Sequence, residues 1–461
     1  MSAPAGAEVN SVTERTDNRQ CPCRAWVGLA LILLLYCGLA VAQSFATRLQ
    51  WGPDEPGHII YVQSLALDAR LPDLTHSEAD NAYLPRAART HEAHQPPLYY
   101  ALAALAWRAF ANRPAQRVTF VDPGRGATHT FEVPGAVRPV RFLSVLLGAL
   151  TLLFVWAAAR TLFPERPSVW LGAVALTAFT PMFTYIHGVI NNDPLIILFF
   201  AAAAWQWARI LRFGAARRDL LLLGLILGGA INAKETALGL VALSVVVMMI
   251  EPGAKSWRQR LARVATVLAI AAALGGWWYA RKWAVYGTPL VYPYHQPLLE
   301  LPLPERAARL AALPGFVFLF TFVPVDVVSR HLNLALVAGF FGLVVVVSII
   351  AVTRFLLRRR RDSTPAYQSQ LLALCVAAAL LVLVGWLRLV LTVDWRMGPI
   401  GGRFLLAVLP LMALAAARAL HRLFGDGKLA APLLALTSLL LLAMNLYAIW
   451  ATAAEYGTLA L

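Results

Sequence analysis

Two adjacent carboxylates, Asp54 and Glu55, lie a few residues past the first long apolar run of the chain, Trp26–Ala46. Pro53 and Pro56 bracket them and restrict the backbone, so the two side chains are held in place rather than left mobile. Ionisable residues at a membrane boundary are costly, and they usually serve a function. Carboxylates in this position could take a proton from a hydroxyl group or share a divalent metal ion.

The segment after these carboxylates, Gly57–Leu67, is predicted to form an amphipathic helix that lies on the membrane. Its apolar residues Ile59, Val62 and Ala66 recur at helical spacing. The acidic pair could therefore serve only as a helix cap and a solvated surface charge. The clustering of other ionisable residues at the same face favours a functional site over this simpler interpretation.

Three histidines, His58, His91 and His94, accompany the carboxylates in the same part of the chain. Histidines and carboxylates together could bind a divalent metal ion, but their spacing is not that of a typical metal site. Hydrogen bonding to a substrate and packing at the membrane interface are the interpretations that we favour. The segment Gln95–Tyr100, with two prolines and two tyrosines, suits such an interface.

Two polar turns interrupt the apolar sequence further on. Asp193 precedes Pro194, and it could either cap the helix that starts there or supply a second carboxylate facing Asp54. Lys234 lies in the turn Asn232–Thr236, where it could snorkel to the interface or hold a phosphate group as a point charge. The sequence leaves both alternatives open for each residue.

A further pair of cations, Arg396 and Arg403, lies near the C-terminal part of the chain. Gly401 and Gly402 precede Arg403 and allow the backbone to approach a neighbour closely. Arg403 is thus a second candidate for binding a phosphate group.

Composition places the chain among membrane proteins. It has 461 residues, of which 59% are hydrophobic and 14% charged, and its mean hydropathy is +0.63. Soluble domains are about 45–50% apolar and about 25% charged. The net charge of +16 comes mostly from short loops between apolar segments, as membrane topology requires, so we predict no nucleic-acid partner. Four cysteines are too few for a disulfide framework.

Eleven apolar segments are candidates to cross the membrane. They are 26–46, 140–162, 168–190, 194–212, 219–233, 236–250, 262–283, 333–353, 370–392, 404–418 and 429–451. A further segment, Leu98–Ala111, is too short to span and is predicted to be a juxtamembrane or re-entrant helix. The predicted fold is therefore an all-α polytopic membrane protein with amphipathic juxtamembrane helices in its first outer loop.

Arginine-rich short loops indicate which side of the cell (inner or plasma) membrane faces the cytoplasm, and they place the N-terminus on the cytoplasmic side. All the candidate residues then fall on the extracytoplasmic face. The expected organisation is a disordered cytoplasmic tail at 1–25, a membrane module at 26–420 with outer loops 47–139 and 284–332, and a last helix with a short outer tail at 421–461.

Several short motifs, taken in their order along the chain, resemble a known family. They are Pro53–Pro56, Gln95–Tyr100, Asn192–Leu195, Ala233–Lys234 with Thr236, Gly275–Tyr279 and Gly402–Phe404. This ordered set resembles the GT-C superfamily of integral membrane glycosyltransferases, in the branch of protein O-mannosyltransferases and aminoarabinose transferases. His58 and His94 resemble a less characterised bacterial subgroup of that branch.

The resemblance implies a transferase that moves a sugar from a polyprenyl-phosphate-linked donor to a lipid, glycan or protein acceptor on the extracytoplasmic face. Asp54 would be the base of a single inverting displacement. Glu55 would orient the acceptor or share a metal ion, and Asp193 would help to place the acceptor or the base. Lys234 and Arg403 would stabilise the departing phosphate.

The remaining expectations concern binding. The substrate-binding residues would be His58, His94, Gln95 and Tyr99. A Mg²⁺ or Mn²⁺ ion is left open, with Asp54, Glu55 and Asp193 as its ligands.

A transporter or flippase of a polar or lipid-linked solute is the alternative function, because transporters also use charges within the membrane. Transport needs a site that both faces can reach, often with broken helices and internal repeats. The sequence shows no clear internal repeat, and its unusual charges crowd one face, so the transferase is favoured.

Overall fold

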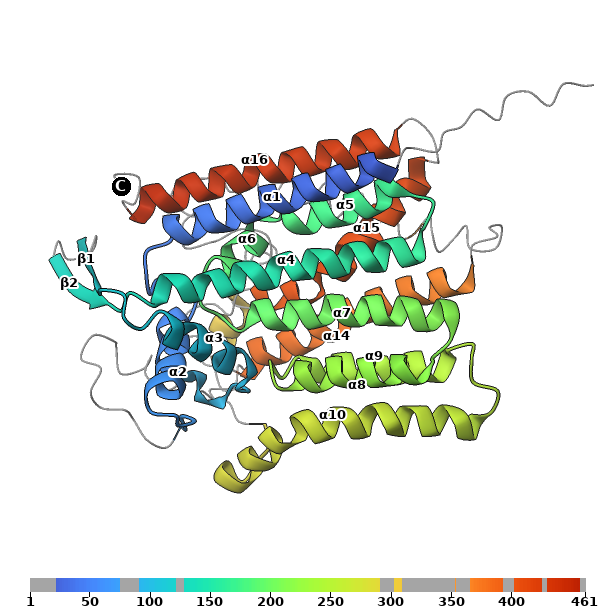
Figure 1. Cartoon of the computed structure of the whole chain (residues 1–461), viewed down its shortest axis with the longest axis horizontal. Coiled ribbons are helices and arrows are strands. Elements are labelled where there is room, and N and C mark those ends of the chain that lie inside the picture. Colours follow the sequence, from blue (N-terminus) through green and yellow to red (C-terminus); the bar gives the residue numbers. More distant parts are fainter. Residues whose placement is uncertain are drawn as a thin grey trace, which may run out of the picture.

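The structure of the protein is a computed structural model that describes residues 22–74, 91–121, 128–290, 302–308, 353, 365–392, 402–424 and 429–456. Long helices run side by side in a bundle, and a smaller group of elements lies at one end of it (Figure 1). The predicted all-α polytopic membrane fold is thus confirmed.

The elements of the fold fall into three groups. The long helices are α1 (Pro22–Ala46), α4 (Val137–Leu162), α7 (Asp193–Phe213), α10 (Trp257–Tyr286), α14 (Ala366–Thr392), α15 (Leu409–Phe424) and α16 (Ala430–Tyr456). The shorter bundle helices are α5 (Pro167–Ala178), α6 (Pro181–His187), α8 (Arg217–Ile231) and α9 (Ala237–Ile250). The remaining elements are α2 (Glu55–Leu67), η2 (His91–His94), α3 (Leu98–Ala109), β1 (Gln116–Val121), β2 (Thr128–Val133) and η5 (Gly402–Val408).

Seven helices in the described part of the chain are long and apolar enough to cross a membrane. Helices α5 and α6 make one further, broken span with a bend of 61°, where Pro181 starts the second helix. Helices α8 and α9 have 15 and 14 residues, fewer than the ~20 that a span usually needs. The predicted count of eleven is therefore not confirmed, and the predicted span 333–353 lies outside the described residues.

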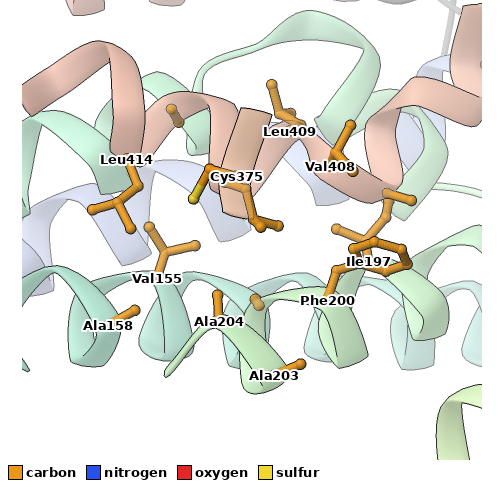
Figure 2. Close-up of a cluster of buried hydrophobic side chains, with 14 of the residues drawn as sticks. Val155, Ala158, Ile197, Phe200, Ala203, Ala204, Cys375, Val408, Leu409 and Leu414 are labelled. Atoms are coloured by element: carbon orange, nitrogen blue, oxygen red, sulfur yellow. The ribbon is translucent and has the colours of Figure 1, made fainter. Parts of the chain in front are cut away.

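Helices α4 and α7 form the centre of the bundle, and α14 and α15 pack against them. Figure 2 shows this core, in which small side chains of α7 such as Ala203 and Ala204 lie beside larger ones such as Phe200 and Val155. Cys375 of α14 is buried in the same cluster, as its position in an apolar run predicts. Small residues at helix contacts let the backbones approach closely, which favours association within a membrane.

Helix α2 differs from the predicted amphipathic surface helix. Nine of its 13 residues are buried, including the polar Glu55, His58 and Ser64. It packs against α3, which lies next to it in Figure 1. The one-sided burial expected of an amphipathic helix is therefore not observed, because α2 buries polar and apolar residues alike, and its position at the membrane surface stays a prediction.

The first outer loop also contains a β-hairpin that the sequence analysis did not predict. Strands β1 and β2 pair antiparallel, from Gln116 opposite Val133 to Val121 opposite Thr128. The hairpin projects from the same end of the bundle as α2 and α3 (Figure 1).

A seam of glycines brings α8 and α10 together. A β-carbon at Gly275 would lie 2.8 Å from Cβ of Ile231 and 2.9 Å from the carbonyl oxygen of Gly228. A β-carbon at Gly228 would in turn lie 2.7 Å from Cβ of Leu274. The neighbouring Gly276 faces away from the seam, since a β-carbon there would meet only Ala272, at 3.9 Å.

We expect Gly275→Ala to destabilise the protein by about 1–3 kcal/mol, because the added methyl group overpacks the seam. Gly276→Ala is the matched control, and it should leave stability unchanged or raise it by about 1 kcal/mol through helix propensity. Thermal unfolding of the two purified variants in detergent measures the difference. Equal midpoints for both variants would contradict the close approach of α8 and α10.

Candidate active site

The candidate residues gather at the end of the bundle where α2 and α3 lie, called here the site end. Helix α7 begins at this end, α8 ends there and α9 begins there (Figure 1). The backbone N–H of Leu98, at the start of α3, donates to the carbonyl oxygen of Asn232 at 2.9 Å. The first outer loop is thus tied directly to the turn between α8 and α9.

Asp54 occupies a strained position just before α2. Its φ of 56° and ψ of 10° lie in the left-handed region, which residues other than glycine rarely adopt. Its carboxylate is 40% exposed and forms an ion pair with Arg403 of η5, whose side chain is 16% exposed. Backbone strain of this kind is concentrated at functional sites, so the structure singles out Asp54 as an accessible carboxylate in a held conformation.

Arg403 joins several acidic residues of the site. Burial alone would lower the pKa of its guanidinium group, but the carboxylates of Asp54, Asp193 and Glu92 together raise the pKa above its ordinary value. Arg403 therefore stays cationic, and its charge acts on all three carboxylates. Asp54, Asp193 and Arg403, which the sequence predicts to lie on one face, are thus close enough in the structure for their charges to interact.

Asp193 and Lys234 form a second ion pair, which is almost fully buried. Asp193 is the first residue of α7, where the helix N-terminus favours a negative charge. The Lys234 ammonium group also lies 3.4 Å from Oδ1 of Asn192. Oδ2 of Asp193 has no hydrogen-bond partner among the described residues, so it can accept a hydrogen bond from a substrate.

Glu55 has a different place from its neighbour Asp54. It is fully buried, and its carboxylate receives two hydrogen bonds from Arg141 of α4, of 2.6 and 2.8 Å. The backbone N–H groups of Gly52 and Ile190 donate to the same carboxylate at 3.0 and 2.9 Å. Glu55, which the sequence analysis expects to orient an acceptor or share a metal ion, is thus occupied by four hydrogen bonds from the protein itself.

Arg141 completes this buried clamp by capping the end of α1. Its guanidinium group donates to the carbonyl oxygens of Ser44, Thr47 and Arg48 at 2.7–2.8 Å. These carbonyl groups lie at the C-terminal end of a helix, where they lack partners within the helix. One arginine therefore fixes the end of α1 and the start of α2, and with them the turn that holds Asp54.

The buried imidazole of His58 lies beside Tyr100 and Glu92. Its Nδ1 is 2.8 Å from the Tyr100 hydroxyl group and 3.8 Å from Oε2 of Glu92. Burial raises the pKa of the Tyr100 hydroxyl, and the charge of Glu92 raises it further, so this hydroxyl stays protonated. His94 is also buried, whereas the side chain of His91 lies outside the described residues.

Tyr99 and Gln95 form hydrogen bonds with other residues of the protein. The Tyr99 hydroxyl lies 3.0 Å from Oγ of Ser144 and accepts a hydrogen bond from the Asn191 backbone at 3.1 Å. Gln95 accepts a hydrogen bond of 3.2 Å from the Asn192 side chain. These contacts tie α3 to the start of α7, so the predicted substrate-binding residues Tyr99 and Gln95 support the positions of others.

Three charged residues of this region were not predicted as site residues. Glu92 lies among acidic residues of a long loop, and nothing in the sequence separates it from them. Arg141 and Lys282 interrupt the apolar helices α4 and α10, and both are fully buried. An ionisable residue inside an apolar span is a recognisable signal of function or of a buried pair, and it could have identified these two.

The three carboxylates considered as metal ligands do not form a shared site. Each one is paired with a different cation, Asp54 with Arg403, Glu55 with Arg141 and Asp193 with Lys234. In the described part of the chain, no three acidic, histidine or cysteine residues come together in a way that would hold a metal ion. These residues therefore do not fit a common Mg²⁺ or Mn²⁺ site.

Comparisons with known proteins agree with the predicted resemblance. Residues 131–279 match the family described as dolichyl-phosphate-mannose-protein mannosyltransferase. The fold is similar to that of ArnT from Cupriavidus metallidurans bound to undecaprenyl phosphate, with a TM-score of 0.51 and 13% identity over 87% of this chain and 61% of that chain. No curated protein matches the sequence.

Two further structures are more distant. The oligosaccharyltransferase of Archaeoglobus fulgidus has a TM-score of 0.45 and 14% identity over 94% of this chain and 55% of that chain. The protein O-mannosyltransferase complex of S. cerevisiae bound to the sugar donor has a TM-score of 0.38 and 17% identity over 60% of this chain and 36% of that chain. This chain thus spans less than two thirds of the length of each of these proteins. The match of residues 131–279 to the mannosyltransferase family and the similarity in fold to ArnT bear out the predicted resemblance.

We expect Glu55→Gln to destabilise the protein by about 3–5 kcal/mol, because it leaves the Arg141 charge buried without its partner. Asp54→Asn, at the adjacent and exposed position, should change stability by much less. Combining Glu55→Gln with Arg141→Met should recover part of the loss, since no buried charge then remains. Thermal unfolding in detergent tests all three variants, and a destabilisation by Asp54→Asn as large as that by Glu55→Gln would refute this division of roles.

Proposed function

We propose that the protein is a membrane glycosyltransferase that takes a sugar from a polyprenyl-phosphate-linked donor. The observation that carries this proposal is the Asp54 carboxylate, which is exposed, held in a strained turn and paired with Arg403. The similarity in fold to ArnT, whose structure holds undecaprenyl phosphate, supports a lipid-linked donor.

The proposed reaction is a single inverting displacement at the anomeric carbon of the sugar. Asp54 accepts the proton of the acceptor hydroxyl group as the acceptor oxygen forms its bond to the anomeric carbon. The bond between that carbon and the phosphate oxygen breaks, and its electron pair leaves with the polyprenyl phosphate. The products are the glycosylated acceptor, a protonated Asp54 and the free lipid phosphate.

The neighbouring residues have distinct roles in this proposal. Arg403 holds the Asp54 carboxylate in position and balances negative charge that develops in the transition state. Asp193 places the acceptor through its available Oδ2 atom, and Lys234 lies beside it as the cation for the departing phosphate. Glu55 acts through Arg141 as a positioning residue, because both of its oxygens are already occupied.

The remaining polar residues of the site are proposed to shape the acceptor pocket. His58 and His94 line the same region as Glu92 and are buried with it. Tyr99 and Gln95 hold α3 against the start of α7. The acceptor is of the lipid, glycan or protein class, and the site faces the extracytoplasmic side of the cell membrane, as the arginine-rich loops on the other side favour.

We expect Asp54→Asn to lower the turnover of polyprenyl-phospho-sugar donors by about 10²–10⁴-fold, the usual contribution of a general base. Binding of undecaprenyl phosphate should persist, because the lipid does not need the base. Asp68→Asn, at the exposed end of α2, is the matched control and should retain turnover. The assay measures sugar release from a panel of donors by the purified full chain.

Turnover of the Asp54→Asn variant within threefold of the unaltered protein would exclude Asp54 as the base. If the unaltered protein processes no donor but moves a polar or lipid-linked solute across vesicle membranes, the transporter function replaces the proposed one.

We also expect turnover to be unchanged by EDTA, because the candidate carboxylates are each paired with a separate cation of the protein. Donor turnover is measured before and after chelation, and then after addition of MgCl₂ or MnCl₂. A loss on chelation that either metal restores would show that an ion takes part, and that the ion pairs rearrange to bind it.

A further inference from the structure

We propose that the turn between α8 and α9, together with the end of α10, binds the phosphate group of the lipid-linked donor. The residues concerned are Glu235, Thr236, Trp278, Tyr279, Arg281 and Lys282, called here the α10 cluster. This inference rests on the proposed function and deepens it, since it names further residues next to Lys234 that hold the donor phosphate.

The α10 cluster is built around a buried lysine. Lys282 is fully buried within an apolar helix and forms an ion pair with Glu235, whose side chain is 11% exposed. A buried lysine is costly, and it is usually retained for a function. Because Glu235 directly follows Lys234 in the chain, the α10 cluster adjoins the pair formed by Lys234 and Asp193.

Four hydrogen-bonding atoms of the α10 cluster are buried without a partner among the described residues. They are Nε1 of Trp278, the hydroxyl oxygens of Tyr279 and Thr236, and Nη1 of Arg281. Each of these groups can donate a hydrogen bond. Buried polar groups are nearly always satisfied in native proteins, so a set of unsatisfied donors beside a lysine indicates a ligand with several acceptor oxygens.

The same residues lie close to one another. The Arg281 guanidinium carbon is 5.1 Å from the centre of the Trp278 ring, and Nζ of Lys282 is 5.8 Å from that of the Tyr279 ring. Arg281 also reaches the first outer loop. Burial raises the pKa of the Tyr61 hydroxyl in α2, and the nearby Arg281 charge opposes that rise. The Leu74 backbone N–H also donates to the Tyr286 hydroxyl at 3.0 Å, so the end of α10 lies against the first outer loop, which carries Asp54.

Charge separates the two regions. Counting only the described residues, three carboxylates (Asp54, Glu92 and Asp193) and two cations (Arg403 and Lys234) lie around Arg403, which sums to a net charge of −1. By the same count the six residues of the α10 cluster include two cations and one carboxylate, which sums to +1. A phosphodiester anion is favoured at the positive region, whereas a neutral hydroxyl acceptor is compatible with the negative one.

The stereochemistry of the proposed displacement also favours this arrangement. Attack and departure occur on opposite sides of the anomeric carbon, so the base and the phosphate must lie on opposite sides of the sugar. Arg403 is paired with the base itself and therefore lies on the acceptor side. The departing phosphate is therefore assigned to the α10 cluster, which contains neither the base nor its partner Arg403.

A lipid-borne phosphate can reach the α10 cluster from the membrane. Helix α10 lies at the edge of the bundle (Figure 1), and Trp277 and Trp283 on it are 45% and 63% exposed. Aromatic residues of this kind are enriched at the interface between membrane and water. The donor can therefore place its chain in the bilayer along α10 while its phosphate enters the cluster.

The test compares Trp278→Phe with Trp257→Phe in the purified full chain, using undecaprenyl phosphate without a sugar as the probe. Trp278→Phe removes one buried donor and should weaken binding by roughly tenfold, the effect of losing a hydrogen bond to a charged group. Trp257→Phe alters an exposed ring at the opposite end of α10 and should leave affinity unchanged. The double variant Glu235→Gln/Lys282→Gln removes both members of the ion pair together and should weaken binding further, and its thermal unfolding shows whether it is folded.

Two competitors show whether the cluster is specific for a polyprenyl phosphate. Binding of undecaprenyl phosphate is measured in the presence of inorganic phosphate and, separately, of phosphatidylglycerol vesicles. Neither should displace undecaprenyl phosphate at equal concentration. Unchanged affinity in both the Trp278→Phe and the folded double variant would overturn the assignment to the α10 cluster, as would equal competition by phosphatidylglycerol. If the unaltered protein binds no undecaprenyl phosphate at all, the proposed function fails together with this inference.

Discussion

The structure of the site end depends on one constraint, which is that a charge buried among apolar helices needs a partner of opposite sign. Removing a charge from water costs several kcal/mol unless a counter-charge and hydrogen bonds compensate for it. Three such buried pairs occur there in the described residues, namely Glu55 with Arg141, Asp193 with Lys234, and Glu235 with Lys282, and a fourth pair, Asp54 with Arg403, is partly exposed. Each pair joins segments that are far apart in the sequence, so pairing the charges also assembles the site.

The pairs differ in how many of their hydrogen bonds the protein itself supplies. This difference distinguishes a pair that stabilises the fold from a pair that is available to react with a substrate. The Glu55–Arg141 pair is fully buried, and its further hydrogen bonds are supplied by the backbone of the end of α1, of the segment between α1 and α2, and of the segment before α7. The Asp54–Arg403 pair is partly exposed and ends in a strained turn. The first arrangement can only hold its surroundings in place, whereas the second can exchange partners with a substrate.

Much of the fold follows from hydrophobic periodicity, since ten of the predicted apolar segments coincide with described helices. The sequence also locates the Asp54, Asp193, Lys234 and Arg403 segments at one face, because loop charges indicate topology. It does not predict which charges pair, since a partner 349 residues away along the chain leaves no local pattern. For the same reason the burial of α2 was missed. Its helical spacing resembles that of a surface helix, and only contacts with distant elements (α3, α4 and η2) cover its polar residues.

Pairing also explains how the proposed reaction can proceed without leaving an uncompensated charge. When Asp54 takes the acceptor proton, its carboxylate becomes neutral, and the charge of Arg403 is no longer balanced by it. At the same moment the phosphodiester becomes a monoester that carries up to one further negative charge. The cation released on the acceptor side therefore offsets the anion formed on the donor side, across the sugar that is transferred. Charges interact strongly in a region of low dielectric, so the Arg403 guanidinium group can attract the departing phosphate across the width of the sugar ring. Arg403 can therefore stabilise the transition state without touching the phosphate.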